Sequence, residues 1–134
     1  MSPLAALKSA LRTALAADGE IAAATGGQPV YDHPPASAAF PCLGFGRVSL
    51  QDWPAAAEPG AEILLTLDIW SRARGTAEVS RLACRVEHCL AAGLTAEPFT
   101  LVNLAPAGCE IRYDPAAEVH HAALTLRAVI EAAA

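Results

Sequence analysis

The sequence has little of what nucleic-acid-binding proteins and membrane proteins usually contain. Its 134 residues carry a formal net charge of −5, and Lys8 is the only lysine among them. Proteins that bind DNA or RNA normally present a surplus of basic side chains to the phosphates, so this charge argues against a dedicated nucleic-acid-binding module. No stretch approaches the ~20 apolar, uncharged residues that a membrane-spanning helix needs. The N-terminal segment lacks the basic and apolar regions of a signal peptide, so we expect a cytosolic protein.

Aromatic side chains and metal-binding cysteine motifs are also scarce. Aromatic residues make up 5% of the chain, and the hydrophobic fraction of 54% owes much to alanine, which buries little surface per residue. The few large rings are therefore expected to matter for packing or docking. The chain has no Cys-x-x-Cys pair, and we expect its four cysteines to be reduced thiols, as is usual in the cytosol. These are Cys42, Cys84, Cys89 and Cys109.

No group of residues predicts catalysis or a phosphate-binding loop. There is no nucleophile-elbow pattern, and the acidic residues are scattered singly rather than paired. Gly44-Phe45-Gly46 is a fragment of a glycine-rich pattern, but it lies within a predicted strand and no helix follows it. We expect instead that another group packs closely against the backbone of these glycines.

Cysteine and histidine residues supply one candidate zinc site, but their placement does not favour metal binding. Cys84 and His88 are four residues apart on a predicted helix, and Cys89 is next to His88. His120-His121 could complete a ligand set. Adjacent histidines on a strand face opposite sides of the sheet, however, and Cys84 and Cys89 fall on or near the apolar stripe of the helix. We therefore expect no metal, no cofactor and no enzymatic activity.

The spacing of apolar residues predicts two main helices packed on a mostly antiparallel sheet, which is an α+β fold. Ser2 and Pro3 are suited to begin the first helix, which Gly19 either ends or kinks into a short continuation. Thr76 is expected to cap the second helix, and Gly93 to end it. The apolar stripe of the second helix consists of Val79, Leu82, Ala83, Val86 and Leu90.

Six segments are predicted as strands, and together with the helices they form one domain over residues 1–134. They are a short strand from Val30, then Cys42–Trp53, Glu62–Arg72, Phe99–Leu104, Glu110–Tyr113 and Glu118–Ile130. Alternation in the third strand places Ile63, Leu65, Leu67 and Ile69 on one face. Alternation in the second strand places Phe45 and Arg47 on one face and Val48 on the other.

Tryptophan and arginine residues gather at the predicted ends of two strands. Trp70, Arg72 and Arg74 lie where a strand passes into the second helix, and Trp53 ends the preceding strand. One interpretation is that the rings cap the core and the arginines are solvated. Trp and Arg are also enriched at interface hot spots. The sharper hypothesis is that Trp53, Trp70, Arg72 and Arg74 lie at an assembly interface. A nucleic-acid site is a third interpretation, which the few basic neighbours of Arg72 and Arg74 disfavour, and composition does not choose among the three.

A series of segments spread over the chain carries a resemblance to a known family. In order, they are LAALKSALRTALAAD, VYDHPP, FPCLGFG, QDW, EILLTLDIWSRARGTAEVSRLACRVEHCL and IRYDP. With these segments the chain resembles the tail terminator (tail completion) proteins of long-tailed phages and gene transfer agents. The most specific part of the resemblance is the passage in which a strand, WSR, a glycine and a helix follow one another.

The resemblance implies a structural virion protein without catalytic residues. It implies a ring of subunits, six copies being expected, that terminates the tail tube and joins the tail to the head-side connector. The implied partners are further copies of the chain, the tail tube protein and the head-side connector or stopper protein. DNA is expected to pass through the lumen without specific binding, and no membrane is involved. The protein is expected in the cytoplasm of the producing bacterium and then at the head–tail junction of the particle.

The residue types and their spacing are compatible with two functions. A subunit whose one patch meets a different patch on its neighbour closes into a ring, and an edge strand that joins the neighbouring sheet would supply such a contact. The net charge suggests an acidic lumen that DNA would not adsorb to. The alternative is a small non-catalytic α+β module that binds a ligand or a protein, with a pocket on the sheet face around Leu43 and Phe45.

Overall fold

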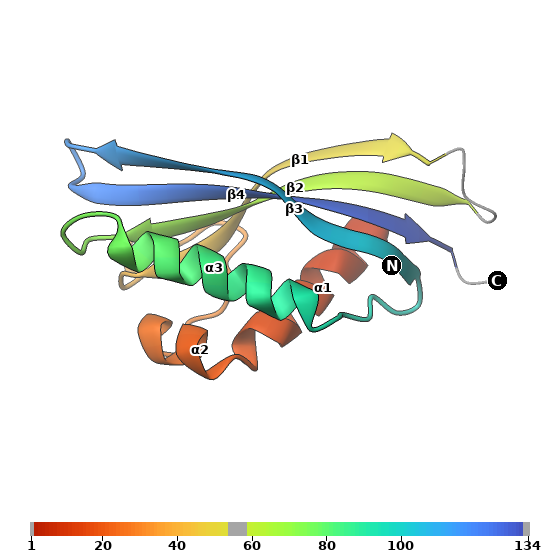
Figure 1. Cartoon of the computed structure of the whole chain (residues 1–134), viewed down its shortest axis with the longest axis horizontal. Coiled ribbons are helices and arrows are strands. Elements are labelled where there is room, and N and C mark those ends of the chain that lie inside the picture. Colours follow the sequence, from red (N-terminus) through yellow and green to blue (C-terminus); the bar gives the residue numbers. More distant parts are fainter. Residues whose placement is uncertain (1, 54–58, 133–134) are drawn as a thin grey trace.

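The computed structural model describes residues 2–53 and 59–132 and shows three helices packed against one face of a four-stranded sheet (Figure 1). The helices are α1 (Pro3–Ala16), α2 (Gly19–Thr25) and α3 (Ala77–Ala91), and none of them is both long and apolar enough to cross a membrane. The strands are β1 (Cys42–Asp52), β2 (Gly60–Ser71), β3 (Thr100–Asp114) and β4 (Val119–Glu131). Neighbouring strands are antiparallel, in the order β1-β2-β4-β3. The predicted α+β fold is confirmed.

The two N-terminal helices form because their first turns are capped and α1 has one apolar face. Ser2 Oγ accepts a hydrogen bond from the Ala5 N–H at 3.1 Å, which satisfies a free amide at the start of α1. Asp18 does the same for α2, since its Oδ2 accepts from the Ile21 N–H at 3.0 Å. Gly19 therefore begins the short continuation that the sequence allows. The buried residues of α1 are Ala6, Leu7, Leu11 and Leu15.

A partly buried ion pair ties α3 to the start of α2. Arg85 Nη2 lies 2.8 Å from Asp18 Oδ1, and Arg85 Nε donates to the two carboxylate oxygens at 2.9 and 3.0 Å. The side chain of Asp18 is only 6% exposed, and that of Arg85 is 30% exposed. The bond to Arg85 lowers the pKa of Asp18, against the opposing effect of burial. The apolar stripe predicted for α3 is buried, together with Cys89.

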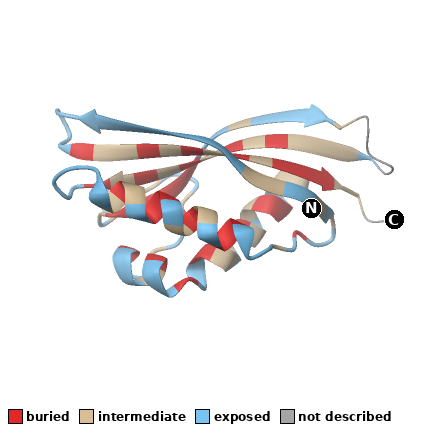
Figure 2. Ribbon diagram, viewed as in Figure 1, coloured by how far each residue is buried: buried red, intermediate tan, exposed pale blue. Residues whose placement is uncertain are grey.

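The hydrophobic core lies between the helices and one face of the sheet (Figure 2). β2 and β4 are the two central strands, so their inward side chains are covered by neighbours on all sides. Every second residue is buried over residues 63–71 of β2 and 122–128 of β4, as the alternation predicts for β2. These buried residues include Ile63, Leu65, Leu67, Ile69, Ala122, Leu124, Leu126, Ala128 and Ile130. The opposite face carries no helix of the described chain, and we call it the open face.

β3 is one long strand where the sequence predicts two. The prediction places a turn at APAG, residues 105–108, between two short strands. Instead, β3 pairs with β4 over its whole length, and its register shifts twice, once before Asn103 and once before Gly108. A bulge absorbs an extra residue without ending a strand. Pro106 is tolerated because β3 lies at the edge of the sheet.

β1 contains a bulge that reverses the alternation of its side chains. Phe45 pairs with Leu67 and Val48 with Leu65, so three steps along β1 correspond to two along β2. After this shift Val48 packs against the core, whereas Arg47 lies over the open face. The prediction that Arg47 shares a face with Phe45 is therefore wrong, because one inserted residue exchanges the two faces of the strand.

Two smaller predictions also need correction. Thr76 stands at the N-cap position of α3, but its side chain makes no capping bond. Ser71 supports the start of this helix instead, since its hydroxyl donates to Glu78 Oε1 at 2.6 Å. The short strand predicted before the proline-rich connector is reduced to a single parallel bridge between Tyr31 and Gly44.

Candidate assembly surfaces

The four predicted interface residues lie at opposite ends of the sheet. Trp70, Arg72 and Arg74 are at the end of β2 and in the loop that leads to α3. Trp53 follows β1, and its N–H donates to the carbonyl of Gly60 at the start of β2, at 3.1 Å. β2 has 12 residues, which at ~3.3 Å per residue puts the two positions on the order of 35 Å apart. The four residues therefore belong to two surfaces rather than one.

Trp70 lies on the open face, where it packs over a glycine and a histidine. Its ring stacks on His121 with the ring centres 5.4 Å apart and the planes inclined by 12°. His121 Nε2 in turn lies 2.7 Å from Asp68 Oδ1. A Cβ atom at Gly44 would lie 3.0 Å from the Trp70 ring, and a Cβ atom at Gly46 would overlap the Asp68 carboxylate. The prediction of close packing against these glycines is confirmed.

Replacing Gly44 with valine is expected to displace Trp70, because the new side chain needs space that the ring occupies. Overpacking of this kind costs about 1–3 kcal/mol of unfolding free energy. Tryptophan fluorescence would report the changed surroundings of the ring, and urea unfolding would report the loss of stability. Gly19→Ala is the matched control, since nothing lies within 4 Å of a Cβ atom there. A Gly44→Val protein with unchanged fluorescence and stability would contradict the expected clash.

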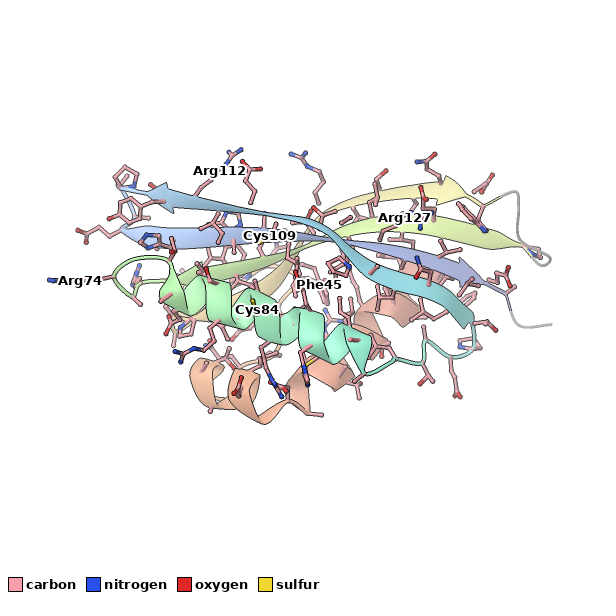
Figure 3. The ribbon with its side chains drawn as sticks, viewed as in Figure 1. Phe45, Arg74, Cys84, Cys109, Arg112 and Arg127 are labelled. Carbon is pink, nitrogen blue, oxygen red and sulfur yellow. The ribbon has the colours of Figure 1, made fainter. Side chains whose placement is uncertain are left out.

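The end of the molecule beside Trp70 combines the β2–α3 loop with the β3–β4 turn. The Arg72 guanidinium lies 4.2 Å from the centre of the Phe40 ring, a cation–π contact. Arg74 is exposed and extends away from the loop (Figure 3). Tyr113 is 51% exposed, and its ring centre is 4.6 Å from that of His120. One hollow is lined by side chains from both segments. We call Trp70, Arg72, Arg74 and Tyr113 the loop end.

Tyr113 is a member of this surface that the sequence did not predict. Its one signal in the sequence is its position immediately before Asp114-Pro115, which predicts a turn. The turn is present, since Asp114 Oδ1 accepts from the amides of Ala116 and Ala117 at 3.0 and 3.3 Å. Only the tertiary structure shows that this turn lies beside the β2–α3 loop.

At the opposite end of the sheet, Trp53 packs within its own subunit. The Arg127 guanidinium lies 5.3 Å from the centre of the Trp53 ring. Arg127 Nη2 is 2.6 Å from Glu62 Oε2, so the arginine is held by a carboxylate while it contacts the indole. Trp53 is half-buried as a result. Part of its ring remains accessible to another protein.

The open face is polar, and several of its charged side chains are paired within the chain. Three of its carboxylates are paired with basic side chains: Glu62 with Arg127, Asp68 with His121, and Glu110 with Arg112. Arg112 projects on this side of the sheet, and Cys84 lies on the helix side (Figure 3). Within residues 2–53 and 59–132, Arg47 has no ion-pair partner. Glu62 and Glu110 are thus each neutralised by an arginine of the same face.

Four large hydrophobic side chains are exposed in the described part of the chain, and all four lie on the edge strands. They are Leu50 of β1, 52% exposed, and Val102, Ile111 and Tyr113 of β3, 52%, 38% and 51% exposed. Leu50 pairs with Ile63 and Ile111 with Ala122, both of which face the helices. The ends of both edge strands lie outside the cover of the helices (Figure 2). Apolar side chains beside free strand edges are typical of sites where another chain binds.

The side chains weighed for a zinc site do not come together. Cys84 is exposed, contrary to its predicted place near the apolar stripe, whereas Cys89 is buried and burial raises the pKa of its thiol. His120 and His121 project from opposite faces of β4, as predicted. Among the residues that the structure describes, no group of three or more His, Cys, Asp or Glu side chains is placed to hold a metal ion.

The side chains of Leu43 and Phe45, around which the sequence allows a pocket, are buried against the helices. These side chains are 2% and 5% exposed. Lys8 and Arg12 of α1 lie over the Phe45 ring, 5.3 and 5.0 Å from its centre. Both basic groups also bond to the Asp32 carboxylate, at 3.0 and 2.9 Å. Phe45 is therefore covered by α1, whereas Leu43 lies at the base of a small hollow of about 160 Å³ between α1, α2 and residues 27–30.

Comparison with known proteins identifies the family of this chain. Residues 9–131 match the family described as Tail completion protein gp17. Among solved structures, the chain is similar to a chain in the virion of a native gene transfer agent (GTA) particle, with a TM-score of 0.84 and 27% sequence identity over 97% of this chain and 98% of that chain. No curated protein matches the sequence. Because the family match spans nearly the whole chain, and agrees with the resemblance carried by the sequence segments, this protein belongs to the Tail completion protein gp17 family.

Proposed function

We propose that this protein is a structural subunit of a phage or gene transfer agent particle, and that its copies form a ring at the head-side end of the tail tube. The ring ends the growth of the tube and joins the tail to the head-side connector. The observation that carries the proposal is the match to a virion chain over almost its whole length. Membership of the tail completion family supports the same position in the tail.

The two edges of the sheet support a ring rather than a two-fold dimer. β1 and β3 differ in length, in side chains and in the position of their bulges. Contact between β1 of one copy and β3 of another is heterologous, and such contacts close into a ring when the rotation between copies closes. Six copies is the number that the resemblance implies.

The separation of the predicted interface residues fits a subunit with two different partners. The loop end and the region of Trp53 lie at opposite ends of the sheet, and we assign them to contacts with the tail tube protein and the head-side connector or stopper protein. DNA passes through the lumen without specific binding. The net charge of −5 and the internal ion pairs of the open face support weak adsorption of the phosphate backbone.

Electron microscopy of the purified protein mixed with tail tubes of its particle tests the proposed function. We expect a six-fold ring that caps one end of each tube. Light scattering of the protein alone then gives the mass of any ring that forms without tubes. Tubes that remain uncapped at saturating protein would overturn the proposal.

Combining Trp70→Ala with Arg74→Glu is expected to weaken attachment to the tail by at least about tenfold, because Trp and Arg are enriched among interface hot spots, whose truncation costs about 2 kcal/mol or more each. Co-sedimentation with tubes or with tailless heads measures the effect, and circular dichroism verifies the fold. Arg81→Glu is a control for the charge change alone, since Arg81 is an exposed arginine of α3 that is not one of the loop-end residues. Unchanged attachment of the double variant would show that the loop end is not a contact surface.

A further inference from the structure

We propose that the ring is closed by main-chain pairing between the free edge of β1 and the free edge of β3. Residues 47–52 of one copy pair antiparallel with residues 109–114 of the next copy, and Leu50 lies opposite Ile111. The inference rests on the ring of the proposed function and adds to it the contact between subunits and the register of that contact.

Each edge strand has one free and regular half within the described chain. On β1 the first half is occupied, since the Tyr31 N–H donates to the Leu43 carbonyl at 3.0 Å and the Tyr31 carbonyl accepts from the Phe45 N–H at 2.8 Å. The outer edge of residues 47–52 is free. On β3 the first half contains both register shifts, whereas residues 108–114 pair regularly with β4. The second halves of the two strands are therefore the ones available to a neighbour.

The hydrogen-bond pattern between β1 and β2 determines which backbone groups of β1 point away from the sheet. Residues of antiparallel strands alternate between those that bond to the partner strand and those that point away from it. The Trp53 N–H donates to the carbonyl of Gly60. Alternation then directs the N–H and C=O groups of Val48, Leu50 and Asp52 away from β2.

The hydrogen-bond patterns of β4 with β2 and with β3 determine in the same way which backbone groups of β3 point away from the sheet. The Ala132 N–H donates to the Pro59 carbonyl at 2.8 Å, so even-numbered residues of β4 bond to β2 and odd-numbered residues bond to β3. The odd-numbered residues of β4 pair with the even-numbered residues 108–114 of β3. The N–H and C=O groups of Cys109, Ile111 and Tyr113 therefore point outward.

Ring symmetry fixes the antiparallel sense of this contact. Leu50 is level with Leu104 across the sheet and not with Ile111, so the proposed register requires strands that are inclined to the ring axis. Because each strand is antiparallel to its neighbours in the order β1-β2-β4-β3, β1 and β3 run in opposite directions. Rotation about the ring axis preserves the direction of a strand along that axis, so β3 of one copy meets β1 of the next antiparallel. Outward residues then face one another in pairs that exchange two hydrogen bonds each. These pairs are Val48 with Tyr113, Leu50 with Ile111, and Asp52 with Cys109.

The side chains favour this register on both faces. Leu50 and Ile111, which are exposed in the isolated subunit, meet on the helix side and remove apolar surface from water. On the open face Arg47, which has no ion-pair partner within the described residues, lies opposite the carboxylate of Asp114. Opposite charges placed directly across a strand pair are stabilising.

Registers shifted by one or two residues lose the Leu50–Ile111 contact and the Arg47–Asp114 charge pair. A slip of two residues in one direction places Arg47 opposite Arg112, so that two positive charges face each other. A slip of two residues in the other direction places Val48 opposite Pro115, which lies beyond the end of β3. A slip of one residue would place outward groups opposite inward groups and leave the backbone unpaired.

Disulfide trapping with the native Cys109 tests the register. The proposed pairing puts Asp52 and Cys109 opposite each other with Cα atoms about 5.5 Å apart, which is within the range of a disulfide. Asp52→Cys is prepared in a Cys84→Ser background, which removes the exposed thiol of α3. The protein is assembled on tail tubes and oxidised with copper–phenanthroline, which accepts the two electrons. We expect a ladder of cross-linked multimers on a non-reducing gel, and a return to monomer after reduction.

Leu50→Cys in the same background is the matched control, because its diagonal distance to Cys109 is about 7–8 Å and should cut cross-linking at least tenfold. Adding Cys109→Ser to the Asp52→Cys protein should remove the ladder. Capped tubes without the Asp52→Cys cross-link, or a stronger cross-link from Leu50→Cys, would overturn the register while leaving the ring intact. Tubes that wild-type protein does not cap would overturn the proposed function itself.

Discussion

Leu50→Pro is expected to abolish ring assembly while the subunit remains folded. The N–H of Leu50 points away from β2, so proline removes no hydrogen bond within the subunit, and proline is tolerated on edge strands. In the ring, the same change leaves the carbonyl of Ile111 on the next copy without its donor. A buried group left without a partner costs about 1–3 kcal/mol, and this penalty recurs at every contact around the ring. Electron microscopy of protein mixed with tubes measures assembly, and circular dichroism measures folding.

Two substitutions separate the main-chain effect from other effects. Leu50→Ala keeps the N–H and removes most of the side chain, so it should weaken assembly less than proline does. Ser49→Pro removes an N–H that points toward β2, so it should destabilise the subunit itself. A Leu50→Pro protein that caps tubes as wild type does would rule out the β1 edge as the ring contact.

Arg85→Ala is expected to lower the unfolding free energy by about 2–3 kcal/mol at neutral pH, since it leaves the buried carboxylate of Asp18 without its charged partner. This carboxylate also caps α2, so the N-terminal helices should be the first region to lose protection in hydrogen exchange. Urea unfolding measures the change. Arg81→Ala, on the exposed side of the same helix, should change stability by less than about 0.5 kcal/mol. Equal stability of the Arg85→Ala and Arg81→Ala proteins would contradict the assigned role of the ion pair.

The pH dependence of this effect has a defined sign. The pKa of Asp18 in the folded protein lies below its ordinary value of 3.8, chiefly because of the bond to Arg85. The contribution of the pair to stability is therefore fully present above that ordinary value and is lost as pH falls through the lower folded pKa. The stability difference between wild type and Arg85→Ala should be constant from about pH 5 to 7 and should shrink in more acidic solution. A difference that grows with acidity would contradict this assignment.

The elements with strong local signals were predictable from the sequence. Ser2 and Pro3 mark the start of α1, and the alternation of β2 identifies its buried face, because cap chemistry and side-chain periodicity are local properties. The family resemblance also came from sequence segments, and the match over residues 9–131 confirms it. The predicted interface residues include Trp70 and Arg74, whose contact role stays a prediction.

The sheet edges and their bulges were not predictable in the same way. The segment APAG contains proline and glycine, which usually indicate a turn, yet pairing with β4 holds residues 105–108 inside a strand. The bulge after Phe45 moves Arg47 to the open face. Gly46 lies in this bulge, but a glycine inside a strand indicates either a bulge or close packing, and the sequence does not distinguish the two. Such irregularities are decided by the partner strand, because hydrogen bonds to that partner offset the local preference of the chain.

The sequence by itself determined the fold class, the capped first helix, the buried face of the central strand and the family. These properties depend on residue types and on their spacing, which are present before the chain folds. Only the tertiary structure decided that Trp53 and Trp70 lie at opposite ends of the sheet, and that Tyr113 lies beside the β2–α3 loop. It also decided which halves of β1 and β3 remain free for a neighbour. Strand order and register bring residues distant in the sequence together, and both are set by the packing of the whole sheet.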